Sequence, residues 1–206
     1  ISATKYKAHF SMGVITDLHG SSVAIDNFVA YINYYKKYFD VAINLGDVSH
    51  YYPSDDALYF TDNAIKSELP FLTMLGNHDR RQGDIELSLS DSFDKFIKPL
   101  ADEGFFITSL PYYHKDFVTD YYKIRLIVLN PYGAESAVTL PTIDYSVRAT
   151  YWDETQINWL ADLLYATPDD YSVIISFHNP DNGTYTVIDS SFSSYIDKKG
   201  GTIGNT

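Results

Sequence analysis

Residues 70–79 read PFLTMLGNHD, an apolar run that ends in three polar side chains, Asn77, His78 and Asp79. A short apolar run bounded by turn-forming residues predicts a buried strand. Asn and His side by side after such a strand have little structural purpose, whereas an amide, an imidazole and a carboxylate can bind metals or transfer protons. This stretch therefore predicts a core strand whose exit carries chemically active groups.

Three further apolar runs also predict buried strands that end in ligand-type side chains. They are HFSMGVIT (9–16) before Asp17 and His19, DVAINLGD (40–47) with Asp47 as its last residue, and SVIISF (172–177) before His178. In layered α/β sheets, ligands bind outside the carboxyl ends of the strands, where the loops converge. We therefore expect two carboxylates, an amide oxygen and two or three imidazoles at one rim.

Helical patterns alternate with these strands. A helix is predicted to begin after Ser21 or Ser22, because apolar residues follow at i, i+3, i+4 and i+7 spacing, namely Ile25, Phe28, Val29 and Ile32. Similar patterns predict helices over 55–69, over a stripe from Phe93 to Leu100 that stops near Pro99 or just beyond, and over 153–166 with Asp153 as its cap.

The middle of the chain is more purely β. FFITSL (105–110) and DYYKIRLIVLN (120–130) predict strands connected as hairpins. Residues 131–151 show no periodicity and predict a functional or covering loop. The whole pattern predicts a layered α/β sandwich in which helices cover a mixed sheet.

Composition limits the possible functions. With 206 residues, of which 45% are hydrophobic, a single domain over 1–206 is expected. The net charge of −12 argues against duplex nucleic acid bound through a basic face. The chain has no cysteine, so the candidate metal ligands are His, Asp, Glu and Asn.

No signal peptide is visible, and no apolar stretch approaches the roughly 20 residues of a membrane span, so no membrane partner is predicted. The sequence begins at Ile1, which leaves a lost leader open. Either a cytoplasmic location or a place in a larger surface or secreted assembly is compatible with these features. The oligomeric state is left open.

The motifs Asp17-Leu18-His19, Gly46-Asp47, Gly76-Asn77-His78-Asp79 and His178 together resemble those of the calcineurin-like metallophosphoesterases, in order and approximate spacing. The resemblance covers nearly the whole chain, and QINWLADLL before VIISFH is similar to that family's approach to its late histidine ligand. It implies an α/β/β/α sandwich. It also implies a metal-dependent phosphoesterase that hydrolyses a phosphomonoester or phosphodiester by attack of a metal-bridging hydroxide.

The resemblance implies two divalent metal ions, with Asp47 bridging them. Asp17 and His19 would complete the protein ligands of one ion, and Asn77 with His178 those of the other. Oxygen ligands mixed with imidazole suit Mn, Fe or Zn better than Ca, and Mn is favoured.

By the same resemblance, His78 is not a ligand but faces the leaving-group oxygen as general acid or electrostatic stabiliser, with Asp79 orienting its ring. The alternatives for Asp79 are a helix N-cap or a loop salt bridge to Arg80. For Arg80 and Arg81 the alternatives are approach to a substrate phosphate and a solvated turn, and their adjacent positions favour the turn. His50 is a further candidate for contact with the site.

One motif of the family is missing from this sequence. A late Gly-His-x-His supplies one further histidine to each ion in the family, whereas residues 179–206 contain no histidine. We expect either a truncated piece of a longer protein, with the C-terminal part of the domain incomplete, or a member that has lost two ligands. The latter defines the alternative function, a non-catalytic binding or structural module with a degenerate metal site.

Overall fold

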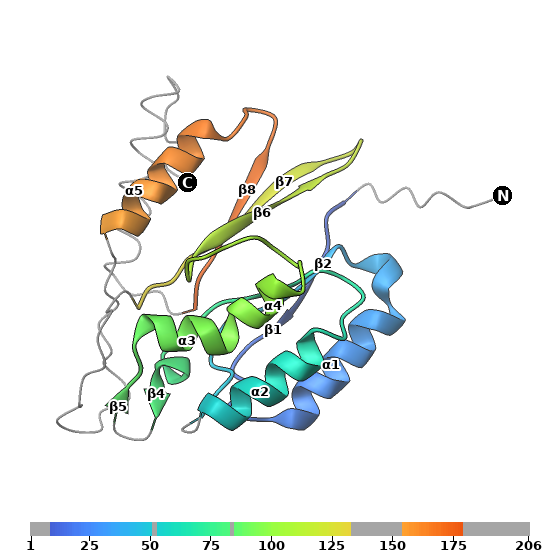
Figure 1. Cartoon of the computed structure of the whole chain (residues 1–206). Coiled ribbons are helices and arrows are strands. Elements are labelled where there is room, and N and C mark those ends of the chain that lie inside the picture. The colour runs from blue at the N-terminus through green and yellow to red at the C-terminus, as the bar shows by residue number, and fades with distance from the viewer. Residues whose placement is uncertain (1–8, 51–52, 83–84, 133–153, 179–206) are drawn as a thin grey trace, which may run out of the picture.

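The computed structural model describes residues 9–50, 53–82, 85–132 and 154–178, and its strands form two three-stranded sheets and a short hairpin (Figure 1). The first sheet is parallel, in the order β1-β2-β3; in the second, β6 runs antiparallel to β7 and β8 parallel to it. The strands are β1 (Met12–Ile15), β2 (Val41–Asn44), β3 (Phe71–Thr73), β4 (Arg81–Gln82), β5 (Ile85–Glu86), β6 (Tyr113–Val118), β7 (Lys123–Val128) and β8 (Ser172–Ser176).

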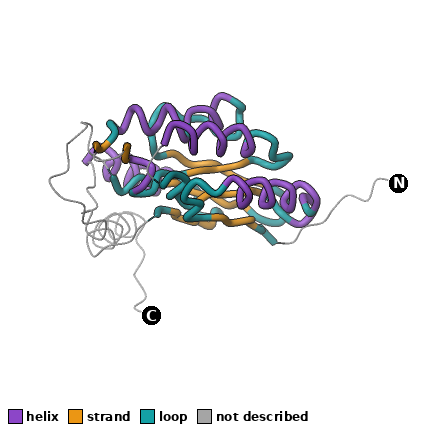
Figure 2. The backbone as a smooth tube through the Cα atoms, turned by 90° about the horizontal axis from the view of Figure 1, so that it is seen from below, coloured by secondary structure: helices purple, strands orange, loops and turns teal. Residues whose placement is uncertain are grey.

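Helices lie along the outer sides of the two three-stranded sheets (Figure 2). The α-helices and 3₁₀ turns are α1 (Ser22–Tyr34), η1 (Lys36–Tyr38), α2 (Pro53–Ala64), η2 (His78–Arg80), α3 (Leu89–Phe96), α4 (Lys98–Asp102) and α5 (Glu154–Ala166). Within the described ranges, none of these helices has the length and apolar character needed to cross a membrane.

In the first sheet, strands β2 and β3 are buried on both faces, which is why they read as nearly continuous apolar runs, whereas Val14 of the edge strand β1 is 49% exposed. All four residues of its central strand β2 are buried. On one face, the ring of Phe71 on β3 meets Phe28 of α1 and Phe60 of α2 edge-on, at centroid distances of 6.0 and 5.8 Å. The predicted stripe of α1 is confirmed, since Ile25, Val29 and Ile32 are its buried residues.

The second sheet separates the first sheet from α5. Leu126 and Val128 of β7 belong to the large core around the first sheet, whereas the alternate residue Ile127 packs with Leu160 and Leu164 of α5. This alternation follows from the two-residue period of a strand. Figure 1 accordingly shows α5 beside β8 and α1 with α2 on the opposite side of the molecule. The layer order is therefore α/β/β/α, as predicted.

A buried tyrosine joins the two sheets. The hydroxyl of Tyr113 on β6 donates to the Thr73 carbonyl oxygen at 2.8 Å and accepts from the Thr73 amide at 3.0 Å. Its ring also stacks on Phe106, with 4.1 Å between centroids. These contacts fix β6 against β3 and so align the two sheets.

The predicted strand over FFITSL (105–110) is wrong. The hairpin partner of β7 is β6, whose Tyr113 pairs with Val128 and whose Val118 pairs with Lys123. Within 105–110, the hydroxyl of Thr108 accepts from the Leu110 amide at 2.9 Å and closes a local turn instead of joining a ladder. Ile107 is 95% exposed, so the apolar composition of this segment does not reflect burial.

Two helix predictions change in their boundaries. The helix predicted over 55–69 is α2, which ends at Ala64. The stripe from Phe93 to Leu100 forms two helices, α3 and α4, that meet at Ile97. Pro99 lies in the first turn of α4, where its missing N–H costs little, whereas it would break a continuous helix. Asp153, residues 133–151 of the predicted loop and residues 179–206 lie outside the described residues.

Candidate metal centre

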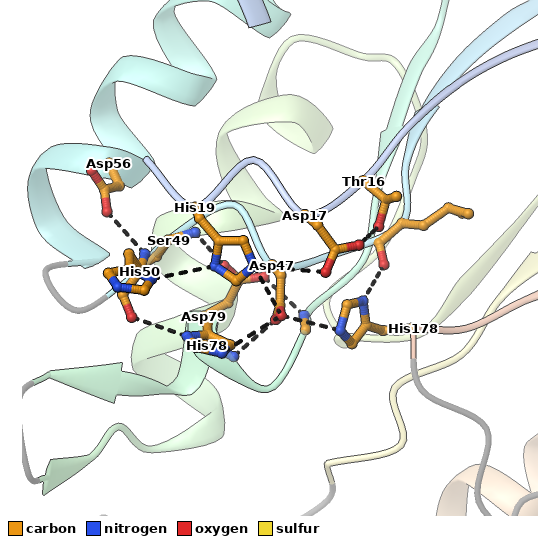
Figure 3. A network of polar contacts seen from close by, with 12 residues as sticks. Thr16, Asp17, His19, Asp47, Ser49, His50, Asp56, His78, Asp79 and His178 are labelled. Atoms are coloured by element: carbon orange, nitrogen blue, oxygen red, sulfur yellow. Dashed lines mark hydrogen bonds and ion pairs between the residues drawn. The ribbon is translucent and has the colours of Figure 1, made fainter. Parts of the chain in front are cut away.

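The carboxyl ends of four strands meet at one rim, and the predicted site residues lie on the loops that leave them. Asp17 and His19 follow β1, Asp47 follows β2, Asn77, His78 and Asp79 follow β3, and His178 follows β8. Figure 3 shows that all of them except Asn77, which it does not draw, form one network of polar contacts. Asn77 is half-buried between Gly76 and His78.

The backbone at this rim is strained. In the described part of the chain, the non-glycine residues with positive φ are Asp17, His19 and Asp47, at 53°, 45° and 54°. This left-handed conformation costs of order 1–3 kcal/mol per residue and persists only where the surroundings enforce it. Here backbone hydrogen bonds join the loops that follow β1 and β2. They run from the Asp17 amide to the Gly46 carbonyl at 3.1 Å and from the His19 amide to the Asp47 carbonyl at 3.0 Å.

Asp47 is the centre of the network. One of its oxygens, Oδ2, lies 3.3 Å from Nε2 of His178, 3.9 Å from Nε2 of His78 and 4.0 Å from Nε2 of His19. Its other oxygen, Oδ1, accepts a hydrogen bond from the backbone amide of His78 at 2.9 Å. Nε2 of His19 also lies 3.7 Å from Oδ1 of Asp17. A single buried carboxylate therefore faces three imidazole rings.

Two glycines make this approach possible. A Cβ at Gly76 would lie 2.0 Å from Oδ1 of Asp47 and 2.3 Å from its backbone nitrogen. At Gly46, whose φ is +97°, a Cβ would lie 2.7 Å from the Gly76 nitrogen and 2.8 Å from Nδ1 of His178. The glycines of the Gly-Asp and Gly-Asn-His-Asp motifs are therefore required by close packing of the loops around the carboxylate.

Asp47 and His178 shift each other's titration. Burial raises the pKa of Asp47, but the hydrogen bond and charge of His178, with the His78 amide, hold it below its usual range. Burial lowers the pKa of His178, but Asp47 outweighs this effect and raises it to about 8. Nδ1 of His178 lies 2.6 Å from the Leu45 carbonyl oxygen, so Nδ1 carries the donor proton and Nε2 faces Asp47.

The environment of Asp79 differs from the prediction. Its buried carboxylate accepts from the Ser49 amide at 2.9 Å and from the Gly76 amide at 2.8 Å, joining the loops after β2 and β3. It therefore does not orient the ring of His78, whose Nδ1 lies 3.1 Å from the carbonyl oxygen of His50. Burial, followed by the charge of Asp47, raises the pKa of Asp79 to about 7.

The predicted solvated turn at Arg80 is wrong. Arg80 is fully buried, and its guanidinium donates to the Leu87 carbonyl at 2.9 Å and to the Tyr132 carbonyl. These two partners are backbone carbonyls, which leave no side-chain signal in the sequence. The salt bridge considered between Asp79 and Arg80 is replaced by these separate contacts. The side chain of Arg81 lies outside the described residues.

Sequence reasoning also missed a buried amide network at the exit of β7. The Asn130 amide donates to Oε1 of Gln156 on α5, and Nε2 of Gln156 donates to the Asn130 carbonyl, both at 2.8 Å. The Gln at the start of QINWLADLL was visible in the sequence, but its partner could not be identified without the fold.

Six titratable groups at the rim form two clusters that could hold metal ions: Asp17, Asp47 and His178, and His19, His50 and His78. Within each cluster, one ligand atom of each residue lies within 4.8 Å of the others. Carboxylate oxygens mixed with imidazole nitrogens fit Mn, Fe or Zn. The structure therefore brings His50 to the site, whereas His114 lies on β6 in the other sheet.

Comparison with known proteins gives a family match over almost the whole chain. The family model described as calcineurin-like phosphoesterase matches residues 10–201. No curated protein sequence matches the chain.

Two solved structures are similar at low identity. GAP50, the anchor in the inner membrane complex of Plasmodium, is 12% identical with a TM-score of 0.47, and the match covers 93% of this chain and 63% of that one. The purple acid phosphatase PPD1 from yellow lupin (Lupinus luteus) seeds is 17% identical with a TM-score of 0.42, covering 82% and 31%. The chain thus spans less than two thirds of either protein.

Proposed function

Because the chain belongs to the calcineurin-like phosphoesterase family, whose members typically bind two divalent metal ions, we propose that it is a metal-dependent hydrolase of phosphate esters. The observation that carries this proposal is the geometry around Asp47, which three imidazoles face from separate loops. The proposed substrate is a phosphomonoester or phosphodiester. Duplex nucleic acid is an unsuitable partner for a chain with a net charge of −12.

The family membership supports two ions that share one carboxylate, and the described clusters differ from the expected partition in grouping Asp17 with His178 and His19 with His50 and His78. Asp47 would be shared, Asp17 and His19 would complete the ligands of one ion, and Asn77 and His178 those of the other. The carboxylate, amide and imidazole donors favour Mn, Fe or Zn, and Mn is the first choice for reconstitution. The proton on His178 must leave when a metal binds, because imidazole binds metals in its neutral form.

When bound, the ions supply Lewis acidity toward the phosphate oxygens and lower the pKa of water at the site. His78 is the residue best arranged to act on the leaving group. Its Nδ1 is held by the His50 carbonyl, so that Nε2 is directed into the site, and its side chain is 14% exposed and therefore accessible from solvent. With a proton on both ring nitrogens, His78 would donate the Nε2 proton to the leaving-group oxygen or stabilise its charge.

The test is hydrolysis of p-nitrophenyl phosphate and bis(p-nitrophenyl) phosphate by the Mn²⁺-loaded protein. We expect turnover of at least one ester, and His78→Ala should lower kcat by about 10²- to 10⁴-fold while metal content stays the same. His114→Ala is the matched control and should change neither.

Loss of metal in His78→Ala would make His78 a ligand and contradict its catalytic role. Stable binding of Mn²⁺ without turnover of either ester would favour the alternative, a non-catalytic module that retains a metal site.

A further inference from the structure

The three histidines that face Asp47 share one orientation. His19, His78 and His178 each direct Nε2 at Oδ2 of this carboxylate. A neutral imidazole carries its proton on one nitrogen and a lone pair on the other. If Nε2 offers its lone pair to a metal ion, Nδ1 carries the proton, and an acceptor at Nδ1 fixes this tautomer. For His178 that second partner is the Leu45 carbonyl at 2.6 Å.

For both other rings, the second partner belongs to a single residue, His50. Its carbonyl oxygen lies 3.1 Å from Nδ1 of His78, and its ring Nδ1 lies 3.5 Å from Nδ1 of His19. The His50 ring stacks on that of His78, with 5.7 Å between centroids and 7° between planes. It meets the His19 ring edge-on at 5.4 Å and 84°, and Figure 3 shows it on the outer side of both.

The position of His50 is itself fixed from the neighbouring helix. Its backbone amide donates to Oδ2 of Asp56 on α2 at 3.2 Å. This contact and the carbonyl contact with His78 both use the backbone of His50. These two hydrogen bonds can therefore persist when the side chain is replaced, whereas the contact with Nδ1 of His19 and the stacking on His78 use the imidazole.

We propose that His50 is a positioning residue, whose imidazole accepts the Nδ1–H of His19 and thereby presents Nε2 of His19 to a metal ion. In metal sites, histidine ligands typically donate their second N–H to an acceptor that fixes both tautomer and ring orientation. Here the imidazole of His50 fills that role. The inference rests on the proposed function in one respect, the role of His19 as a metal ligand.

The experiment compares His50→Leu with His50→Asn. Leu removes the acceptor and keeps an apolar side chain of substantial size, whereas the Asn side-chain oxygen can take the place of the imidazole Nδ1. We expect His50→Leu to weaken Mn²⁺ binding about 10- to 100-fold, as loss of such a partner does, and His50→Asn to stay within a few-fold of the parent chain. Binding is measured by isothermal titration calorimetry, and folding of each variant by thermal unfolding.

A second measurement is independent of catalysis and of metal. Nitrogen-15 NMR of the histidine rings in the metal-free protein should give the Nδ1–H tautomer for His19 in the parent chain and in His50→Asn. It should give a mixture of tautomers in His50→Leu, while His78 keeps Nδ1–H in all three because its acceptor is a backbone carbonyl.

Equal Mn²⁺ affinities and an unchanged His19 tautomer in all three chains would overturn the proposal. So would equal loss of metal in both variants, because His50 would then be a ligand. Absence of ester hydrolysis with these differences intact would refute the proposed function and leave the role of His50 standing.

Discussion

The exits of β2 and β7 both bury polar groups at the same rim, but the two differ in how those groups are satisfied. At the exit of β7, Asn130 and Gln156 are each 1% exposed and exchange two hydrogen bonds of 2.8 Å. At the exit of β2, Asp47 is 3% exposed, carries a charge, and depends on the rings of His178 and its neighbours for compensation.

The backbone differs in the same way. The left-handed non-glycine residues of the described chain lie at the exits of β1 and β2, and the exit of β7 has none. A neutral amide network with matched donors and acceptors stabilises the fold by itself. A strained, charged cluster of ligand-type groups is stable only because the surrounding loops enforce it, and a bound cation would stabilise it further. Polar burial at the exit of β7 thus serves the fold, whereas polar burial at the exit of β2 is of the kind that a cation would compensate.

Of the substitutions proposed, Gly76→Ala should have the largest effect, and this effect should be confined to the exit of β2. The new Cβ would lie 2.0 Å from Oδ1 of Asp47, so the carboxylate or the whole loop must move. We expect Mn²⁺ affinity to drop by at least about 100-fold, close to the value for Asp47→Ala, measured by calorimetry.

Gly104→Ala is the control for this substitution. Its φ of +81° makes alanine strained, but no atom lies within 4 Å of the added Cβ. It should therefore cost about 1–2 kcal/mol of stability and leave metal affinity unchanged. Parent-like affinity in Gly76→Ala would mean that the close approach of Gly76 and Asp47 is not needed for binding.

Gln156→Ala tests the amide network at the exit of β7. It removes both hydrogen bonds to the backbone of Asn130 and leaves buried groups unpaired, so it should lower the free energy of unfolding by about 2 kcal/mol. The measurement is urea unfolding of the metal-free protein. Mn²⁺ affinity should stay within a few-fold of the parent value; a loss as large as that of Gly76→Ala would erase the distinction between the two exits.

Most of the rim could be predicted because one local signal repeats along the chain. An apolar run followed by a ligand-type side chain, as before Asp47 or His178, marks both a buried strand and its exit. The carboxyl ends of parallel strands share an edge, so the meeting of these residues follows from topology. The alternation of strands and helices predicted a layered α/β sandwich, whereas the α/β/β/α order with two sheets was implied by the family resemblance.

Other features depend on partners that leave no signature in the sequence. Arg80 is bound by carbonyls of Leu87 and Tyr132, which any residue could supply. Strand β6 was not predicted because it carries charged residues. One of them, Asp116, accepts hydrogen bonds from Nε and Nη2 of Arg125 at 2.8 and 2.7 Å. Such long-range pairs compensate for a weak local pattern only after the chain has folded.

The smallest effect expected is a difference in pH response between a histidine at the rim and one outside it. In the metal-free protein Asp47 outweighs burial and raises the pKa of His178 to about 8, from an ordinary value of 6.5. Burial, with the charge of Arg125, lowers the pKa of His114 on β6. The folded state thus holds the proton of His178 more tightly than the unfolded chain does, and that of His114 less tightly.

By linkage, the stabilisation from His178 is fully present below pH 6.5 and is lost as pH rises through about 8, whereas His114 opposes folding as pH falls below 6.5. The measurement is the free energy of unfolding in the presence of a chelator between pH 5.5 and 9. Compared with the parent chain, this free energy should fall less steeply above pH 6.5 in His178→Gln. In His114→Gln it should fall less steeply as the pH decreases below 6.5. Burial raises the pKa of Asp79 to about 7, so Asp79 adds a loss of stability as pH rises toward 7, and this loss should remain in His114→Gln. Saturating Mn²⁺ should remove the His178 response and leave that of His114, because only the former is proposed to bind the ion in its neutral form. A His114 response that also vanished with Mn²⁺ would extend the metal's influence beyond the rim and break the comparison.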